Sequence, residues 1–187
     1  MPLNHEEKIE LLRLARGAIE DYVRRREFLP AAPQSENLRQ KGGAFVTLEA
    51  DGELRGCIGH LAADKPLFLT VQEMAIEAAT GDPRFPAVSP EELPRIEIEI
   101  SVLSPIESLP RERLNEIEIG KHGLIVAHRG RRGLLLPQVA KEEGWDREAF
   151  LAATCRKAGL PMDAWKNPET RIEVFTAEVF SERNSAP

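Results

Sequence analysis

The residue types best suited to chemistry cluster in the pentapeptide Arg55-Gly56-Cys57-Ile58-Gly59. Cysteine attacks substrates as the thiolate, and a neighbouring cation lowers the pKa of a thiol. Alternate side chains of a strand share a face, so Arg55 and Cys57 should lie together, with Leu54 and Ile58 on the opposite, core-facing side. The pattern predicts that Arg55 activates a nucleophilic Cys57. The alternative is a cysteine that only fills space in the core.

The two glycines of this pentapeptide, Gly56 and Gly59, weaken a strand and therefore need a reason. The usual reasons are a β-bulge or the close approach of another backbone or of a ligand. We expect both glycines to leave room for a small molecule beside the Cys57 sulfur, as part of a substrate-binding surface.

Two further side chains are candidates for the same site. His122 stands between Gly120 and Gly123, where a tight turn could present its ring as a base for Cys57. The alternative is a turn histidine that is hydrogen-bonded to the backbone. Arg84 lies in a loop stiffened by prolines and could bind a substrate carboxylate or phosphate, or instead clamp loop carbonyl groups. We expect Arg55, Cys57, Arg84 and His122 to line one cavity.

The other cysteine and the histidines suggest no second centre. Cys155 follows Leu151 at helical spacing and should be shielded in the core, which leaves Cys57 as the reactive thiol. His60 follows Cys57 by three residues, but this half-motif has no second arm, so no metal site is predicted. Neither a P-loop nor a dinucleotide fingerprint occurs, and no cofactor is predicted.

The elements that position these residues follow from hydrophobic periodicity and turn signals. Asn4 and Glu7 predict a capping box at the start of a helix that runs to about residue 27. Asp51-Gly52 predicts a hairpin turn between two strands. The other elements expected are a helix capped by Asp64 and ended by Gly81, strands at 96–102, 117–119, 124–127, 134–136 and 171–180, and a helix at 147–158.

Strands and helices alternate here without a regular βαβ rhythm, which favours an α+β fold. The expected sheet is mixed or antiparallel and curved, with helices packed on it. At 187 residues the chain predicts a single domain over residues 1–187, with two closely packed halves as the alternative.

The charge balance argues against nucleic acid as a ligand. The formal net charge is −6, and the two basic clusters, Arg24–Arg26 and Arg129–Arg132, have no interleaved aromatic residues. The first cluster should end a helix and the second should form a hairpin tip. No apolar run is long enough for a membrane span, and the polar N-terminus predicts a cytoplasmic protein.

Several segments together resemble the AMMECR1-domain family. They are Leu54–Gly59, which resembles the family's signature hexapeptide, Asp82–Pro86, Gly120–Leu124, Leu136–Ala140, Trp145 and Lys157–Leu160, and they extend over nearly the whole chain. The resemblance implies an α+β fold with an internal duplication around one barrel-like sheet. It places Arg55, Gly56, Cys57, Gly59, Arg84, Phe85 and His122 in the family's motifs. It also implies Memo-like and radical-SAM proteins as partners.

Two hypotheses about function follow. In the first, the chain is an enzyme or enzyme subunit that uses Cys57 in a pocket on a small polar substrate. In the second, it is a non-catalytic binding module that recruits a protein partner or, as the weaker option, RNA. The accessibility of Cys57 discriminates between them, because a thiol sealed in the core cannot act as a nucleophile.

Overall fold

The computed structural model describes residues 2–185, which divide into two compact units. Unit 1 comprises the chain up to Leu103 together with the segment from Glu178 on, and unit 2 comprises Ser104–Ala177. The long strand β7 (Arg171–Ser181) belongs to unit 2 up to Ala177, and its last residues belong to unit 1.

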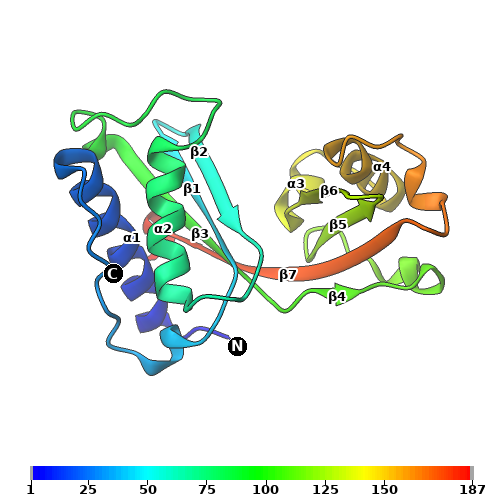
Figure 1. Ribbon diagram of the computed structural model, residues 1–187, viewed down its shortest axis with the longest axis horizontal. Helices are drawn as coiled ribbons and strands as arrows, with labels where there is room; N and C mark the ends of the chain where they lie inside the picture. Colours follow the sequence, from blue (N-terminus) through cyan, green and yellow to red (C-terminus); the bar gives the residue numbers. More distant parts are fainter. Residues whose placement is uncertain (1, 186–187) are drawn as a thin grey trace. The chain divides into compact units, whose positions relative to one another are not determined.

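Unit 1 is an antiparallel sheet in the order β2-β1-β3, with two long helices on one face (Figure 1). Its core lies between the sheet and these helices, and Val46, Leu48, Ile98 and Ile100 are fully buried there. The elements of unit 1 are α1 (His5–Arg25), η1 (Glu36–Arg39), β1 (Ala44–Ala50), β2 (Glu53–His60), α2 (Leu67–Thr80), η2 (Leu93–Arg95), β3 (Ile96–Leu103) and α5 (Glu182–Ser185).

The caps of α1 and α2 agree only in part with those predicted from the sequence. Asn4 and Glu7 form the predicted capping box, and Arg26 ends α1 in the left-handed conformation. The prediction for α2 was half right: Gly81 ends the helix, but Asp64 does not cap it. Pro66 is the N-cap residue, and the Asp64 carboxylate instead bonds to His60 Nε2 at 2.7 Å.

The connection between α1 and β1 is tied to both helices by side chains rather than by secondary structure. The buried Glu7 carboxylate accepts hydrogen bonds from Ser35 Oγ at 2.7 Å and from Asn37 Nδ2 at 3.1 Å. Burial by itself would raise the pKa of Glu7, but these bonds and the one from the Asn4 backbone lower it. Gln72 of α2 exchanges two hydrogen bonds with the Ala31 backbone.

Unit 2 is built around a second hairpin, β5 (His122–His128) and β6 (Arg131–Leu135), whose first strand pairs with β7. The Arg129-Gly130 tip is where the sequence predicted it. The segment 117–119, predicted as a strand, is instead a turn region, in which Ile117 is buried and Lys121 and His122 bond back to Glu118. The other elements are β4 (Glu107–Ser108), η3 (Arg111–Glu116), α3 (Pro137–Glu142), α4 (Arg147–Lys157) and η4 (Ala164–Lys166).

The two units repeat one arrangement. In each, a hairpin is followed by helix and then by a third strand that pairs with the first strand of the hairpin, giving β2-β1-β3 and β6-β5-β7. These pairings are all antiparallel. The predicted α+β class, with antiparallel strands and packed helices, is confirmed, and the repeat is the internal duplication that the family resemblance implied. Among residues 2–185, no helix is long and apolar enough to span a membrane.

Candidate functional site

The strand that carries Cys57 contains a β-bulge. Leu48 pairs with Gly56 and Glu49 pairs with Leu54, so Arg55 is an extra residue without a partner on β1. A bulge of this kind breaks the alternation of side chains along the strand. The prediction that Leu54 faces the core is wrong, because this residue is 44% exposed, whereas Ile58 packs on the core as predicted.

The protein itself fills the space that the two glycines leave. A β-carbon on Gly56 would lie 2.1 Å from the Ala78 carbonyl oxygen of α2, and one on Gly59 would lie 2.2 Å from the Phe45 ring. The predicted bulge and close backbone approach are present at Gly56, whereas the close neighbour of Gly59 is a side chain. The room expected there for a small molecule is occupied by α2 and by Phe45.

Cys57 lies on the face of the sheet that points away from the helices. Its neighbour Gly56 faces α2, and residues paired across strands share a face, so Cys57, Thr47 and Glu99 form one row across β2, β1 and β3. Thr47 Oγ1 donates a hydrogen bond to Cys57 Sγ at 3.2 Å. The thiol is half-buried rather than sealed.

The electrostatics of this row differ from the prediction. Burial raises the pKa of the Cys57 thiol above its ordinary value, and the negative charges of Asp82 and Glu99 raise it further. The Thr47 hydrogen bond and the Arg84 charge only partly oppose this rise. The expected low thiol pKa is therefore wrong, and Cys57 is protonated at neutral pH.

Asp82 organises the loop that follows α2. Its buried carboxylate accepts the Cys57 backbone N–H at 2.9 Å, and Arg84 donates to it from the backbone N, from Nε at 3.0 Å and from Nη2 at 2.7 Å. The hydrogen bonds from Arg84 hold the pKa of Asp82 far below its usual range, against the effect of burial. Half of the Arg84 side chain remains exposed, at 53%.

Arg55 is committed to a different partner. Its Nε donates to Glu92 Oε1 at 2.9 Å, and this bond lowers the pKa of the Glu92 carboxyl. The guanidinium groups of Arg55 and Arg84 both lie over the Phe85 ring, 5.9 Å and 5.4 Å from its centre. Within the described residues, the buried Nη1 of Arg55 has no hydrogen-bond partner. Arg84, rather than Arg55, is the cation whose charge acts on the Cys57 thiol.

Comparison with known proteins places the whole arrangement in one family. The AMMECR1 family model matches residues 12–180. The chain belongs to the AMMECR1 family. A relative from Methanothermobacter thermautotrophicus is 50% identical over 97% of both chains. Protein MK0488 from Methanopyrus kandleri is 50% identical over 96% of this chain and 90% of its own.

The fold is shared with a solved member of similar sequence. The crystal structure of the uncharacterized protein PH0010 from Pyrococcus horikoshii superimposes with a TM-score of 0.89 at 44% identity. It covers 95% of this chain and 92% of its own. Family membership and the α+β fold are thus established. The names of these relatives do not state an activity.

His122 begins β5 and bonds within its own turn. Its Nδ1 accepts the Glu118 backbone N–H at 3.0 Å. This matches the turn-histidine alternative. The bond occupies the lone pair that a neutral imidazole would use as a base, which leaves Nε2 as a donor. Catalysis by His122 stays a prediction, and it requires that bond to break.

Cys155 behaves as the sequence predicts. It is fully buried in α4, and burial raises the pKa of its thiol. The two cysteines are both free thiols. Over residues 2–185, no group of three or more His, Cys, Asp or Glu side chains is arranged to hold a metal ion.

The sequence reasoning missed the groups that surround the thiol. These are Thr47, Asp82 and Glu99, and it also missed Glu92, which pairs with Arg55. Gly56 was a usable signal, since a glycine within a strand indicates a bulge. If the two strands are paired outward from the two-residue turn without a bulge, Cys57 pairs with Val46. The one bulge residue moves the partner of Cys57 to Thr47.

Proposed function

We propose that this AMMECR1-family chain is an enzyme, or the reactive subunit of one, that uses the Cys57 thiol on a small polar substrate. The observation that carries the proposal is the contrast between the two thiols. Cys155 is fully buried, whereas Cys57 is half-buried, accepts a hydrogen bond from Thr47 Oγ1 and has its backbone N–H held by Asp82. A packing cysteine has no need of such surroundings.

The raised pKa of Cys57 determines the type of chemistry. A protonated thiol must lose its proton as it attacks, and a nearby base makes this possible. Glu99 stands in the same cross-strand row, and its charge reaches the sulfur. In the proposed step the sulfur lone pair bonds to an electrophilic carbon, the thiol proton passes to Glu99, and the displaced electron pair moves onto a substrate oxygen.

The two arginines supply positive charge for that oxygen or for an acidic group of the substrate. Arg84 is held by Asp82 through one side of its guanidinium while half of its side chain stays exposed. The buried Nη1 of Arg55 has no hydrogen-bond partner within the described residues, and such a buried nitrogen is costly unless a ligand or water accepts its N–H groups. We therefore propose that Arg55 binds the substrate.

Alkylation of the native protein with iodoacetamide, followed by peptide mapping, tests the thiol directly. Cys57 should be labelled first, at a rate that keeps rising above pH 9, because its thiolate forms only at high pH. The Cys155→Ala variant is the matched control and should react like the wild type. Labelling of Cys57 only after denaturation would contradict the proposal.

Metabolite profiling tests the function. A strain that lacks the gene is complemented with wild type, Cys57→Ala or Glu99→Gln, and Cys155→Ala serves as the control. We expect the metabolite that accumulates in the deletion strain to persist with the first two variants and to disappear with the control. Full complementation by Cys57→Ala would favour the non-catalytic binding module.

Two expectations from the family resemblance remain part of the proposal. A Memo-like or radical-SAM partner would be revealed by co-purification with the tagged wild-type chain. The base role of His122 would be revealed by a His122→Gln variant that loses complementation while it retains the wild-type stability and alkylation rate. Complementation by His122→Gln would assign that proton transfer to Glu99 alone.

A further inference from the structure

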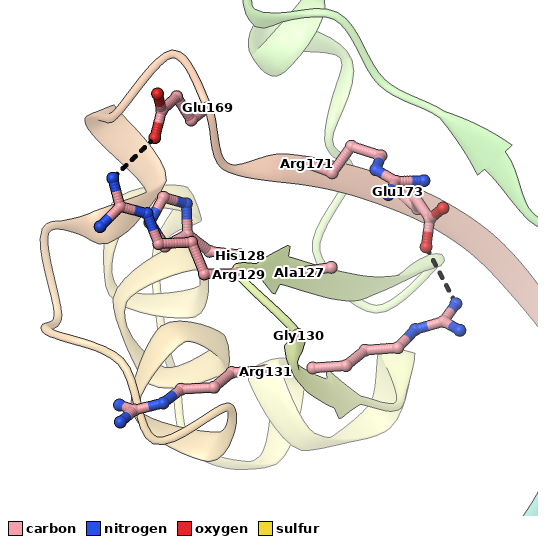
Figure 2. Close-up of a pocket in the computed structure, with 9 residues that line it drawn as sticks. Ala127, His128, Arg129, Gly130, Arg131, Glu169, Arg171 and Glu173 are labelled. Atoms are coloured by element: carbon pink, nitrogen blue, oxygen red, sulfur yellow. Dashed lines mark hydrogen bonds and ion pairs between the residues drawn. The ribbon is translucent and has the colours of Figure 1, made fainter.

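A second polar site lies at the tip of the β5–β6 hairpin, within unit 2. A cavity of about 280 Å³ opens there between the hairpin and the start of β7 (Figure 2). Its charged lining consists of the arginines Arg129, Arg131, Arg132 and Arg171 and the carboxylates Glu169 and Glu173. The arginines outnumber the carboxylates by two, so the cavity is positively charged.

This positive charge stands out against the rest of the chain. Unit 1 carries 13 Lys and Arg against 20 Asp and Glu, whereas unit 2 carries 12 against 11. The cations at the cavity are all arginines, whose planar guanidinium groups form paired hydrogen bonds with phosphate or carboxylate oxygens. The composition of the cavity therefore favours an anionic ligand.

The strand register explains how two of the arginines meet. Arg132 and Arg171 are both paired with Ala127, one from each neighbouring strand, so the three residues form a row across β6, β5 and β7. Residues in such a row share a face of the sheet. The small Ala127 side chain between two long ones leaves the hollow, and both guanidinium groups can reach a ligand above it.

Few of these guanidinium groups are firmly held. Arg132 pairs with Glu173 at 2.9 Å and Arg129 with Glu169 at 3.2 Å, both in contact with solvent. The Arg129–Glu169 pair is exposed at both side chains, and an exposed pair contributes little to stability and exchanges readily for another anion. Arg131 is the exception, because it donates to the Gly159 carbonyl at 2.6 Å. Within residues 2–185 the Arg171 side chain has no hydrogen bond or ion pair.

The backbone at Arg129 supplies an independent observation. Arg129 adopts a left-handed conformation with φ of 46°, in the first central position of the hairpin turn. Asn, Asp and Gly are the residues that such a turn favours, and the corresponding position of the first hairpin holds Asp51, with φ of 54°. An arginine is a poor choice for the turn itself, so its charge needs a role outside the turn.

The geometry points to a binding site for a compact anion that carries two phosphate groups. Arg132 and Arg171 would hold one phosphate over Ala127, and Arg129 would reach the second from the turn. A cavity of about 280 Å³ fits a ligand of this size and is too small to enclose a large cofactor. This site is separate from the Cys57 row and does not depend on the function proposed there.

Titration calorimetry with inorganic pyrophosphate at low salt tests the site on the full chain. Arg171→Gln and Arg129→Asn should each weaken binding about tenfold, which corresponds to the loss of one charged hydrogen-bonding partner. Arg95→Gln is the matched control, because Arg95 pairs with Asp51 at the tip of the other hairpin and is similarly exposed. Its affinity should stay within twofold of the wild type.

Arg129→Asn also separates a binding role from a structural one. Asparagine suits the turn better than arginine, so this variant should unfold at the same or higher urea concentration while it binds pyrophosphate less tightly. No pyrophosphate binding by the wild type, or equal loss of binding in Arg95→Gln, would overturn the inference. Citrate binding as tight as pyrophosphate would overturn the preference for phosphate, and tighter binding of a short single-stranded RNA would overturn the small-ligand assignment.

Discussion

The β1–β2 and β5–β6 hairpins have the same strand pairing, except that the first contains one extra residue. In each, a glycine of the second strand lies against the end of a helix, Gly56 against Ala78 and Gly133 against Ala158. Gly56 pairs with Leu48 and Gly133 with Val126, so the two positions correspond. The first hairpin inserts Arg55 as a bulge before its glycine, and the second has no counterpart.

The two units differ in the cross-strand row that follows these glycines. Unit 1 carries Cys57, Thr47 and Glu99 where unit 2 carries Leu134, Ile125 and Glu173. The hairpin tips differ in charge, since the acidic Asp51 of unit 1 corresponds to the basic Arg129 of unit 2. The same strand arrangement therefore carries a thiol on the sheet face in unit 1 and a cluster of arginines at the hairpin tip in unit 2.

The largest expected effect concerns the shared glycines. Gly56→Ala and Gly133→Ala should each lower the free energy of unfolding by about 3 kcal/mol, because the new methyl group meets helix backbone that cannot move aside. Urea unfolding measures this. Gly17→Ala is the control, since a β-carbon at this position of α1 would meet no atom within 4 Å outside its own turn of helix, and it should stabilise by about 0.5–1 kcal/mol. A mild effect at only one of the two glycines would break the equivalence.

A smaller effect is expected at Asp82, which has no role in the repeat. Asp82→Asn should destabilise the protein by about 2 kcal/mol, because a buried carboxylate with four hydrogen bonds is lost. The control Asp21→Asn, at an exposed position of α1, should change stability by less than about 0.5 kcal/mol.

The same residue predicts a pH dependence. The folded pKa of Asp82 lies below the unfolded value of about 3.9, so its contribution is complete above that pH and is lost as the pH falls further. Asp82→Asn should therefore lose less stability than the wild type between about pH 4 and pH 2. Parallel acid-unfolding curves for the two proteins would contradict the assignment.

Another prediction concerns the row that contains Cys57. Thr47→Val gives this row an apolar middle residue, as in the corresponding row of unit 2. Thr47→Val removes the hydrogen bond that lowers the pKa of Cys57, so the thiol pKa should rise. Alkylation at pH 8 should slow about threefold, because a smaller fraction of the thiol is ionised. Thr47→Ser keeps the hydroxyl group and should react at nearly the wild-type rate. An unchanged rate in Thr47→Val would mean that the bond does not stabilise the thiolate.

The smallest effect concerns the turns. Asp51→Arg gives the first hairpin the turn residue of the second and should destabilise by about 0.5 kcal/mol, through poorer turn chemistry and the lost pair with Arg95. Thermal unfolding is a suitable measurement. A stabilising effect would show that arginine suits this turn, which would remove one support of the anion site.

Much of the fold could be predicted because its signals are local. The Asn4 capping box, the Asp51-Gly52 turn, the alternation over β3 and the Arg129-Gly130 tip depend on residues a few positions apart, and each is present. The failures are also local in origin. Asp64 looked like a helix cap but bonds to His60, and the apolar pattern at 117–119 buries Ile117 without forming a strand.

The sequence by itself determined the family, the α+β class, the identity of the half-buried thiol and the burial of Cys155. Only the tertiary structure decided what surrounds that thiol. One bulge residue, next to the glycine that meets α2, shifts the partner of Cys57 to Thr47, and this residue, Arg55, pairs with Glu92. Asp82 then brings Arg84 to the thiol from a loop 25 residues away. Strand register depends on long-range packing, and a shift of one residue changes every neighbour of a side chain.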